Sequence, residues 1–174
     1  ANLMGLPNTS GSFPYYPGYC GIGQVTALGE GVQNVAVGDR ALITWAGHRS
    51  HALQKAADLT LVRDDRIDSR EAAFVPIAAM GLQGVRKVRL ELGESVMVIG
   101  LGLLGQFAVQ CARLSGAIPV LVSDFDCRRR EVARQLGADY AFSPDEGNLP
   151  ERLRELTDGQ GPACVIEVTG AAVA

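Results

Sequence analysis

Apolar runs and helical patterns alternate along the second half of the chain. Residues 95–100 and 118–124 are largely apolar, which is typical of strands buried on both faces of a parallel sheet. Pro119 is compatible with the second strand only at its entry. Residues 139–144 and 163–170 predict two further strands. Because helical patterns separate these four strands, the sequence predicts consecutive βαβ units, a parallel sheet and right-handed crossovers, which is an α/β fold.

Three helices are expected between these strands. They cover residues 103–114, 128–137 and 149–159, and Gly137 is expected as the C′ residue of the second helix. One apolar face of the first helix is predicted to comprise Leu104, Phe107, Ala108, Cys111 and Leu114. In the third helix, the residues predicted to point inward are Leu149, Leu153 and Leu156.

The first 68 residues have a different pattern, in which glycines separate short β-branched or apolar runs. Runs at 24–28, 32–37 and 40–45 predict small antiparallel strands in a barrel-like or sandwich-like β unit. Residues 69–74 can then begin a helix with Asp68 or Ser69 as its N-cap. Pro76 is expected to break or kink this helix, and the apolar spacing resumes over 77–88 and closes at Gly93.

Composition narrows the classes of partner. The chain has 174 residues and a formal net charge of −3, which argues against nucleic acid because phosphate binding needs a basic excess. Residues 96–112 are apolar except for two glutamines, but glycines interrupt them, so a buried strand and helix explain them better than a membrane span. The four cysteines form no CxxC pair, and with no secretory signal we expect a cytoplasmic protein.

The motif that carries chemistry is GxGxxG at residues 100–105. It follows a predicted strand and opens a predicted helix, as the dinucleotide-binding fingerprint requires. Gly100 would allow the tight turn, Gly102 would let the backbone approach a pyrophosphate, and Gly105 would let the helix pack close to the strand. The alternatives are a purely structural turn and a methyltransferase. Methyltransferases usually carry an acidic residue just before the first glycine, where this chain reads VMVI.

Asp124 ends the second predicted strand, 24 positions after Gly100, which is near the spacing expected for a ribose-binding acid. A carboxylate there accepts hydrogen bonds from both ribose hydroxyls and repels a 2′-phosphate, so it favours NAD over NADP. Arg128, Arg129 and Arg130 keep NADP open, because an arginine in this loop could pair with a 2′-phosphate.

Longer segments resemble the medium-chain dehydrogenase/reductase family, that is, the zinc alcohol dehydrogenases and their zinc-free relatives. These segments read PYYPGYCGIGQVTALGEGVQNVAVGDRAL, VMVIGLGLLGQFAVQCARLSGA, SDFDCRRREVARQLGAD and CVIEVTG. The resemblance implies a partial GroES-like β domain over 1–72 and a partial NAD(P)-binding Rossmann domain over 73–174. It also implies a fragment, inactive by itself, of a protein that forms a homodimer and acts on a small-molecule substrate.

The resemblance further implies the cofactor and its contacts. We expect NAD, with NADP as the alternative, held by Gly100, Gly102, Leu103, Leu104, Gly105, Asp124, Arg129, Thr169 and Gly170. The expected function is a nicotinamide-dependent oxidoreductase that transfers a hydride. The alternative is a non-catalytic dinucleotide sensor or structural relative.

The zinc ligands of the family are replaced in this chain. In zinc-dependent members a His-Glu pair follows the proline-glycine of the first segment, and here Tyr19 and Cys20 stand in its place. A cysteine ligand would fall near Val75 or Pro76, and neither can bind a metal. The segment after GDR also lacks the clustered cysteines that hold structural zinc. The resemblance is therefore to a zinc-lacking subgroup, and no metal is expected.

Two expectations follow for the remaining candidates. Without zinc, a carbonyl substrate needs another hydrogen-bond or proton donor, and Tyr19 is the candidate catalytic residue. His48 and His51 are the two histidines of the chain, and three positions apart they could form half of a metal site. The family places them in a loop that leads into a strand, so a surface or hydrogen-bonding role is expected.

Overall fold

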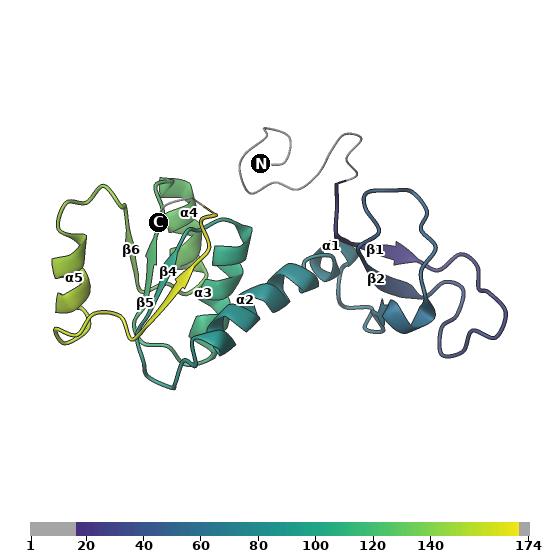
Figure 1. The fold of residues 1–174 in the computed structure, drawn as a ribbon, viewed down its shortest axis with the longest axis horizontal. Helices are drawn as coiled ribbons and strands as arrows, with labels where there is room; N and C mark the ends of the chain where they lie inside the picture. Colours follow the sequence, from purple (N-terminus) through teal and green to yellow (C-terminus); the bar gives the residue numbers. More distant parts are fainter. Residues whose placement is uncertain (1–16, 171–174) are drawn as a thin grey trace. The chain divides into compact units, whose positions relative to one another are not determined.

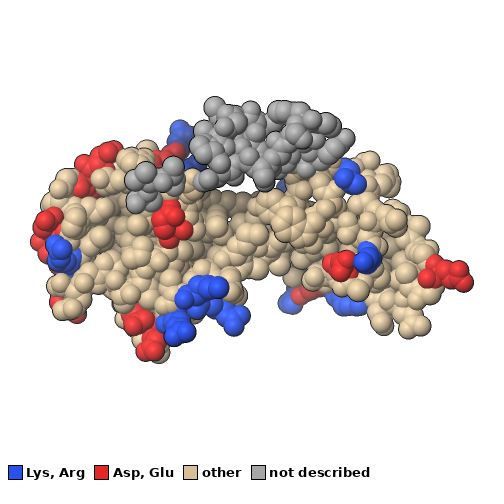
Figure 2. Space-filling view, in the orientation of Figure 1, with Lys and Arg blue, Asp and Glu red and all other residues tan. Residues whose placement is uncertain are grey.

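The computed structural model describes residues 17–170. Contacts divide the chain into two compact units, the first ending at Val75 and the second beginning at Pro76 (Figure 1). On the face drawn in Figure 2, acidic and basic side chains are interspersed among neutral ones. Within the described residues, no helix combines the length and the apolar composition that crossing a membrane requires.

The second unit is built on a parallel four-stranded sheet. Its strands are β4 (Val96–Ile99), β5 (Val120–Ser123), β6 (Tyr140–Phe142) and β7 (Cys164–Glu167). They lie in the spatial order β6-β5-β4-β7. The connecting helices are α3 (Leu103–Leu114), α4 (Cys127–Gln135) and α5 (Leu149–Glu155). The prediction of an α/β fold with four parallel strands is therefore confirmed.

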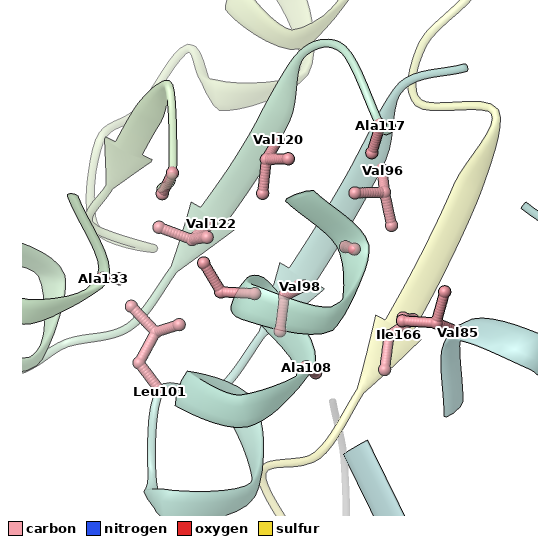
Figure 3. Packing of buried hydrophobic residues seen from close by; sticks show 13 residues of the cluster. Val85, Val96, Val98, Leu101, Ala108, Ala117, Val120, Val122, Ala133 and Ile166 are labelled. Atoms are coloured by element: carbon pink, nitrogen blue, oxygen red, sulfur yellow. The ribbon is translucent and has the colours of Figure 1, made fainter. Parts of the chain in front are cut away.

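Alternate side chains of the strands point to opposite faces of the sheet and form two separate cores. The larger core joins the valines of β4 and β5 to α3, to α4 and to Val85 (Figure 3). The smaller core contains Met97, Leu121 and Phe142, and the three leucines at 149, 153 and 156 pack against it. The inward orientation predicted for these leucines is confirmed, and α5 covers the face opposite to α3 (Figure 1).

Helix α3 buries a different stripe from the one that was predicted. Its buried residues are Gly105, Ala108, Val109 and Ala112, whereas Leu114 is 88% exposed. The predicted stripe is offset because small side chains, rather than the largest ones, allow α3 to lie close to its neighbours. A Cβ at Gly81 would lie 3.0 Å from the Ala108 nitrogen and 3.0 Å from the Phe107 Cβ, so Gly81 permits the close approach to α3. At the end of α4, Gly137 has φ +112°, which confirms its predicted place at the helix terminus.

The first unit contains a three-stranded antiparallel sheet, so the predicted antiparallel β unit is confirmed. The predicted run at 40–45 forms a strand, but the run predicted at 24–28 does so only at Gln24, because the strand there covers 20–24. Its strands are β1 (Cys20–Gln24), β2 (Arg40–Thr44) and β3 (Thr60–Leu61), and a short 3₁₀ helix, η2, covers Ala56–Asp58. The strand predicted at 32–37 is wrong. Ala36 donates its N–H to an Asp39 side-chain oxygen at 2.9 Å, and Asn34 has a left-handed φ of 65°. The backbone of this run therefore forms turns and not a ladder.

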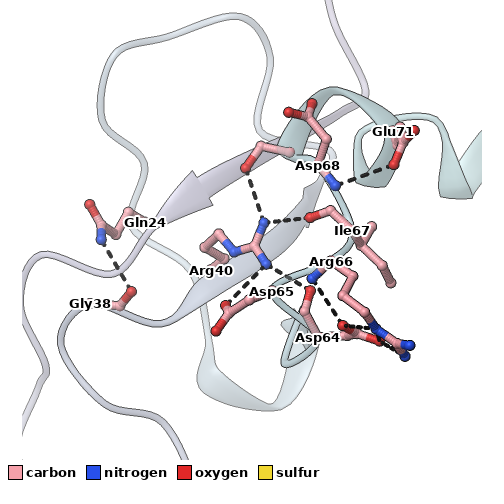
Figure 4. A network of polar contacts seen from close by, with 10 residues as sticks. Gln24, Gly38, Arg40, Asp64, Asp65, Arg66, Ile67, Asp68 and Glu71 are labelled. Atoms are coloured by element: carbon pink, nitrogen blue, oxygen red, sulfur yellow. Dashed lines mark hydrogen bonds and ion pairs between the residues drawn. The ribbon is translucent and has the colours of Figure 1, made fainter.

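A partly buried arginine, Arg40, links segments of the first unit (Figure 4). The Arg40 guanidinium donates to the Ile67 carbonyl at 2.8 Å and to the Asp64 carbonyl at 2.9 Å. One of its nitrogens also lies 3.6 Å from an Asp65 carboxylate oxygen. These contacts tie the start of β2 to the segment that leads into the first helix.

The helix boundaries near this segment follow the sequence signals. Helix α1 covers Ser69–Ala72, and its N-cap is Asp68, one of the two predicted residues. The Asp68 carboxylate accepts the Arg70 N–H at 2.7 Å, and the Asp68 N–H donates to Glu71 at 3.2 Å, which forms a capping box. Helix α2 (Val75–Lys87) begins beside Pro76, so the predicted helix break is confirmed.

Candidate functional site

The glycine motif forms a tight turn between β4 and α3. Gly100 has φ +90°, and its N–H donates to the Ser123 carbonyl at 2.8 Å. A Cβ at Gly105 would lie only 1.9 Å from the Gly100 oxygen, so no larger residue fits there without a shift of the turn. A Cβ at Gly102 would meet nothing within 4 Å, which leaves the outer side of the turn open. Gly102 is also the N-cap of α3 and provides no side-chain cap.

This open turn has the properties of an anion-binding site. The first N–H groups of a helix have no intrahelical partner, and the helix dipole places positive charge at the same end. Leu103 and Leu104 occupy the first positions of α3, and Leu103 is 51% exposed. Backbone groups of the turn and of the helix start can therefore receive phosphate oxygens from the open side.

Asp124 directly follows β5 and faces this turn. One carboxylate oxygen accepts the Leu101 N–H at 2.7 Å, and the other accepts the Asp126 N–H at 2.8 Å. The side chain is 11% exposed. Each carboxylate oxygen can accept more than one hydrogen bond, so acceptor capacity remains for a hydroxyl group. Residues 23 positions apart are thus held together at the carboxyl end of the sheet.

The three arginines after Asp124 have different surroundings. Arg129 places a guanidinium nitrogen 3.7 Å from an Asp124 carboxylate oxygen, and its side chain is 55% exposed. Arg130 instead donates to the carbonyls of Asp124 and Phe125, at 2.6 and 3.0 Å. The N–H groups of Arg129 and Arg128 donate to Asp126, the N-cap of α4, and these bonds lower the pKa of Asp126. Arg129 is therefore the arginine that lies beside the Asp124 carboxylate.

Thr169 and Gly170 follow β7 and lie near the glycine turn. A Cβ at Gly100 would lie 2.9 Å from the Thr169 Cγ2 and 3.0 Å from the Thr169 nitrogen, and Gly170 has a φ of 66°. The Thr169 N–H and hydroxyl both donate to Glu167, and these bonds lower the pKa of Glu167. The loops after β4, β5 and β7 therefore meet where the strand order reverses, which is the usual ligand-binding crevice of open α/β sheets.

Gln106 is a residue of this site that sequence reasoning missed. Its amide nitrogen donates to the Leu101 carbonyl at 3.2 Å and to the Arg129 carbonyl at 2.9 Å. Its amide oxygen is buried and has no hydrogen-bond partner among the described residues. The available signal was a glutamine in an otherwise apolar stretch, where a polar side chain needs a specific partner.

Tyr19, the candidate proton donor, lies in the first unit. Its ring is tilted against Trp45 with 6.2 Å between the ring centroids, and its carbonyl accepts the Trp45 N–H at 2.8 Å. Tyr19 is 45% exposed. The next residue, Cys20, begins β1 and is paired with Thr44. Tyr19 thus belongs to a solvent-exposed aromatic pair next to the edge of the sheet.

The potential metal ligands of the first unit do not assemble. Cys20, His48 and His51 line the same cavity of about 590 Å³. His48 packs its ring against Gly18, where a Cβ would lie 2.8 Å from the imidazole, and the His51 Nδ1 is 3.3 Å from the Ser50 hydroxyl. Between residues 17 and 170, no three His, Cys, Asp or Glu side chains lie close enough to share a metal ion. These residues do not fit a tetrahedral zinc site.

The other cysteines lie in the second unit. Burial raises the pKa of the Cys111 thiol and of the Cys164 thiol, and the Cys164 thiol donates to the Val88 carbonyl at 3.4 Å. Both side chains pack against the larger core. Cys127, at the start of α4, is exposed. The packing of Cys111 and Cys164 agrees with a space-filling role.

Comparison with known proteins agrees with this geometry. A family model described as zinc-binding dehydrogenase matches residues 104–174. The D-guloside 3-dehydrogenase of Escherichia coli (strain K12) is 29% identical over 150 residues, which cover 86% of this chain and 43% of that protein. The structure of the alcohol dehydrogenase TADH from Thermus sp. ATN1 has a TM-score of 0.73 at 26% identity, covering 87% of this chain and 54% of that one. These matches are all to dehydrogenases, and they agree with the resemblance to the medium-chain dehydrogenase/reductase family.

A solved structure from Sinorhizobium meliloti 1021, named as a zinc-binding dehydrogenase, is bound to NADP. The present chain matches it with a TM-score of 0.76 at 25% identity, over 87% of this chain and 53% of that chain. The chain thus spans about half the length of the proteins that it matches. The expected partial Rossmann fold, preceded by part of a GroES-like β unit, is confirmed.

Proposed function

We propose that this protein is a nicotinamide-dependent dehydrogenase that binds its dinucleotide at the carboxyl end of β4 and β5. The observation that carries the proposal is the 2.7 Å hydrogen bond between Asp124 and the Leu101 N–H, because it sets a ribose-binding carboxylate beside an open glycine turn. The similarity to dehydrogenases and to an NADP-bound structure supports the same assignment.

The proposed cofactor contacts come from three loops. The turn residues Gly100, Gly102 and Gly105 and the first N–H groups of α3 would receive the pyrophosphate. Asp124 would accept hydrogen bonds from the ribose, next to Arg129. Thr169 and Gly170 would border the cofactor near Gly100. The bound nicotinamide accepts or donates the hydride, and the chain orients it.

We propose NAD as the preferred form. Backbone N–H groups hold both oxygens of the Asp124 carboxylate in place, and a carboxylate at this position repels a 2′-phosphate. Arg129 is the residue that would support NADP, because its half-exposed guanidinium lies beside the place of the 2′-substituent. The balance between these two side chains decides the preference.

We propose that turnover needs no zinc from this chain. The residue types support this. Tyr19 and Cys20 stand in place of the His-Glu pair of zinc-dependent relatives, and the cysteine ligand of those relatives would fall near Val75 or Pro76. The segments 1–16 and 171–174 contain no His, Cys, Asp or Glu. Tyr19 is the proposed donor to a small carbonyl or alcohol substrate. The net charge of −3 argues against nucleic acid as a partner. We also propose that the full-length protein is a cytoplasmic homodimer that does not bind membranes.

A second candidate is a dinucleotide sensor without catalytic activity. It is favoured by the replacement of the zinc ligands of relatives, which leaves the site without a clear general acid. Both candidates require the same cofactor site. They differ in whether cofactor binding leads to turnover.

The test is calorimetric titration of the full-length protein with NAD and with NADP. Asp124→Asn keeps the shape of the side chain but removes its charge, so we expect about tenfold weaker NAD binding and a smaller NAD preference. Asp145→Asn is the matched control, because Asp145 is exposed and lies outside these contacts. No binding of either cofactor at millimolar concentration would refute the proposal. Binding without turnover on alcohols, aldehydes and quinones would favour the sensor, and activity that survives a chelator would support the zinc-free reaction.

A further inference from the structure

Gln106 connects two loops that are distant in the sequence. Its side-chain amide nitrogen reaches the Leu101 carbonyl, inside the glycine turn, and the Arg129 carbonyl, in the first turn of α4. Arg129 is 23 positions further along the chain. The Gln106 side chain therefore links two backbone segments. One is the glycine turn at Leu101, the proposed phosphate site, and the other is the start of α4 at Arg129, whose side chain belongs to the proposed ribose site.

The same two loops are joined at their strand ends as well. Gly100 donates to the Ser123 carbonyl, and Leu101 donates to Asp124. These bonds fix the loops close to β4 and β5, and they connect to the start of α4 indirectly, through the Asp124 carboxylate, which also accepts the Asp126 N–H. The bond from Gln106 to the Arg129 carbonyl reaches that helix, so it restrains the position from which the Arg129 side chain extends toward Asp124.

The chemistry of the position indicates that hydrogen bonding, and not packing, is the role of the glutamine. The Gln106 amide oxygen is buried without a partner among the described residues, and an unpaired buried acceptor is destabilising. A leucine of similar size would fill the same space without this penalty. What the glutamine adds is a nitrogen that can donate two hydrogen bonds at once.

We propose that Gln106 is a positioning residue for the cofactor, which sets the separation between the glycine turn and the Asp124–Arg129 pair. The inference rests on the proposed function, because these loops are the proposed contacts for pyrophosphate and ribose. Gln106 does not touch the reacting atoms. It acts through the backbone of Leu101 and of Arg129.

The test uses two variants and one matched control. Gln106→Leu removes both donated bonds together with the unpaired acceptor. Gln106→Glu keeps the size but replaces the donor by an oxygen that faces two carbonyls. Gln110→Leu is the control, because Gln110 lies one turn further on α3 and donates within the helix, to the Gln106 carbonyl. Each is titrated with NAD and assayed at varied cofactor concentration.

We expect the Kd for NAD to rise about tenfold in Gln106→Leu and more in Gln106→Glu, with Gln110→Leu within twofold of the unmutated protein. In the enzyme assay the KM for the cofactor should rise while kcat at saturating cofactor stays constant. A purely structural role would lower the melting temperature without this split. An unchanged Kd in Gln106→Leu would overturn the proposal.

Hydrogen exchange separates this inference from the proposed function. In Gln106→Leu, amides of residues 100–106 and 124–130 should exchange faster together, with no cofactor present. If the unmutated protein binds no dinucleotide, the proposed function fails and the cofactor role of Gln106 fails with it. Faster exchange would then still establish that Gln106 joins the loops, and unchanged exchange would refute the structural link itself.

Discussion

Replacing Gly105 by alanine places a methyl group inside the turn. The added Cβ would lie 1.9 Å from the Gly100 oxygen, 3.0 Å from the Gly100 carbonyl carbon and 3.3 Å from the Val168 Cγ2. Ordinary contacts of this kind begin near 3.4 Å, so the Gly100 carbonyl must move by about 1.5 Å, the difference between 3.4 and 1.9. The first contact is with backbone, which cannot rotate away as a side chain could.

The energetic penalty follows from what this movement breaks. A shift of this size lengthens the Gly100–Ser123 bond from 2.8 Å and the Leu101–Asp124 bond from 2.7 Å beyond hydrogen-bonding range. Each lost bond is worth about 1 kcal/mol, and overpacking adds about 1–3 kcal/mol. We therefore expect Gly105→Ala to reduce the free energy of unfolding by about 3 kcal/mol or more.

Urea denaturation of Gly105→Ala and Gly102→Ala measures this effect. Gly102 has φ −65° and ψ −172°, and nothing lies within 4 Å of its added Cβ, so its stability should change by less than about 1 kcal/mol. The same methyl group would occupy the open side of the turn, so Gly102→Ala should weaken NAD binding in a stable protein. If Gly105→Ala unfolds within 1 kcal/mol of the unmutated protein, the turn is not packed as described.

Two further outcomes are expected. The Phe142 side chain lies beneath α5 and is only 2% exposed. Phe142→Ala should reduce the free energy of unfolding, measured by urea denaturation, by about 3–5 kcal/mol. A loss below about 1 kcal/mol would contradict the packing of the smaller core. The bonds from Thr169 hold the folded-state pKa of Glu167 below 4.5, so their stabilising effect is present above that pH and is lost as the pH falls through the folded-state pKa. Thr169→Val should raise this pKa in an NMR titration, and an unchanged titration would show that the hydroxyl does not contribute.

The sequence was sufficient for features that depend on local pattern. Asp124 was identified because it ends the second predicted strand at the spacing of the fingerprint, and the parallel pairing of β4 with β5 then brings it to the same edge of the sheet as Gly100. The N-cap at Asp68 and the helix end at Gly137 follow from side-chain and backbone preferences of single residues.

Other features depend on contacts that a pattern does not contain. The run at 32–37 looks like a strand, but a turn closed by the Asp39 carboxylate competes for its backbone. The buried stripe of α3 was misplaced because small residues of the helix, and not its largest ones, pack into the core, and this depends on the neighbouring elements. The bonds of Gln106 join residues from two loops, so periodicity could not reveal them.

The two cores of the second unit differ in size, and this has a consequence for local stability. The smaller core beneath α5 has three buried residues, and α5 itself has none, whereas α3 and α4 share the larger core with the central strands. Local opening favours segments with little buried apolar surface, so α5 should fluctuate more often than α3. The glycine turn leads directly into α3, so it lies in the part of the unit that should open less often. A ligand arriving there meets a surface that is already ordered, so little conformational entropy is lost on binding.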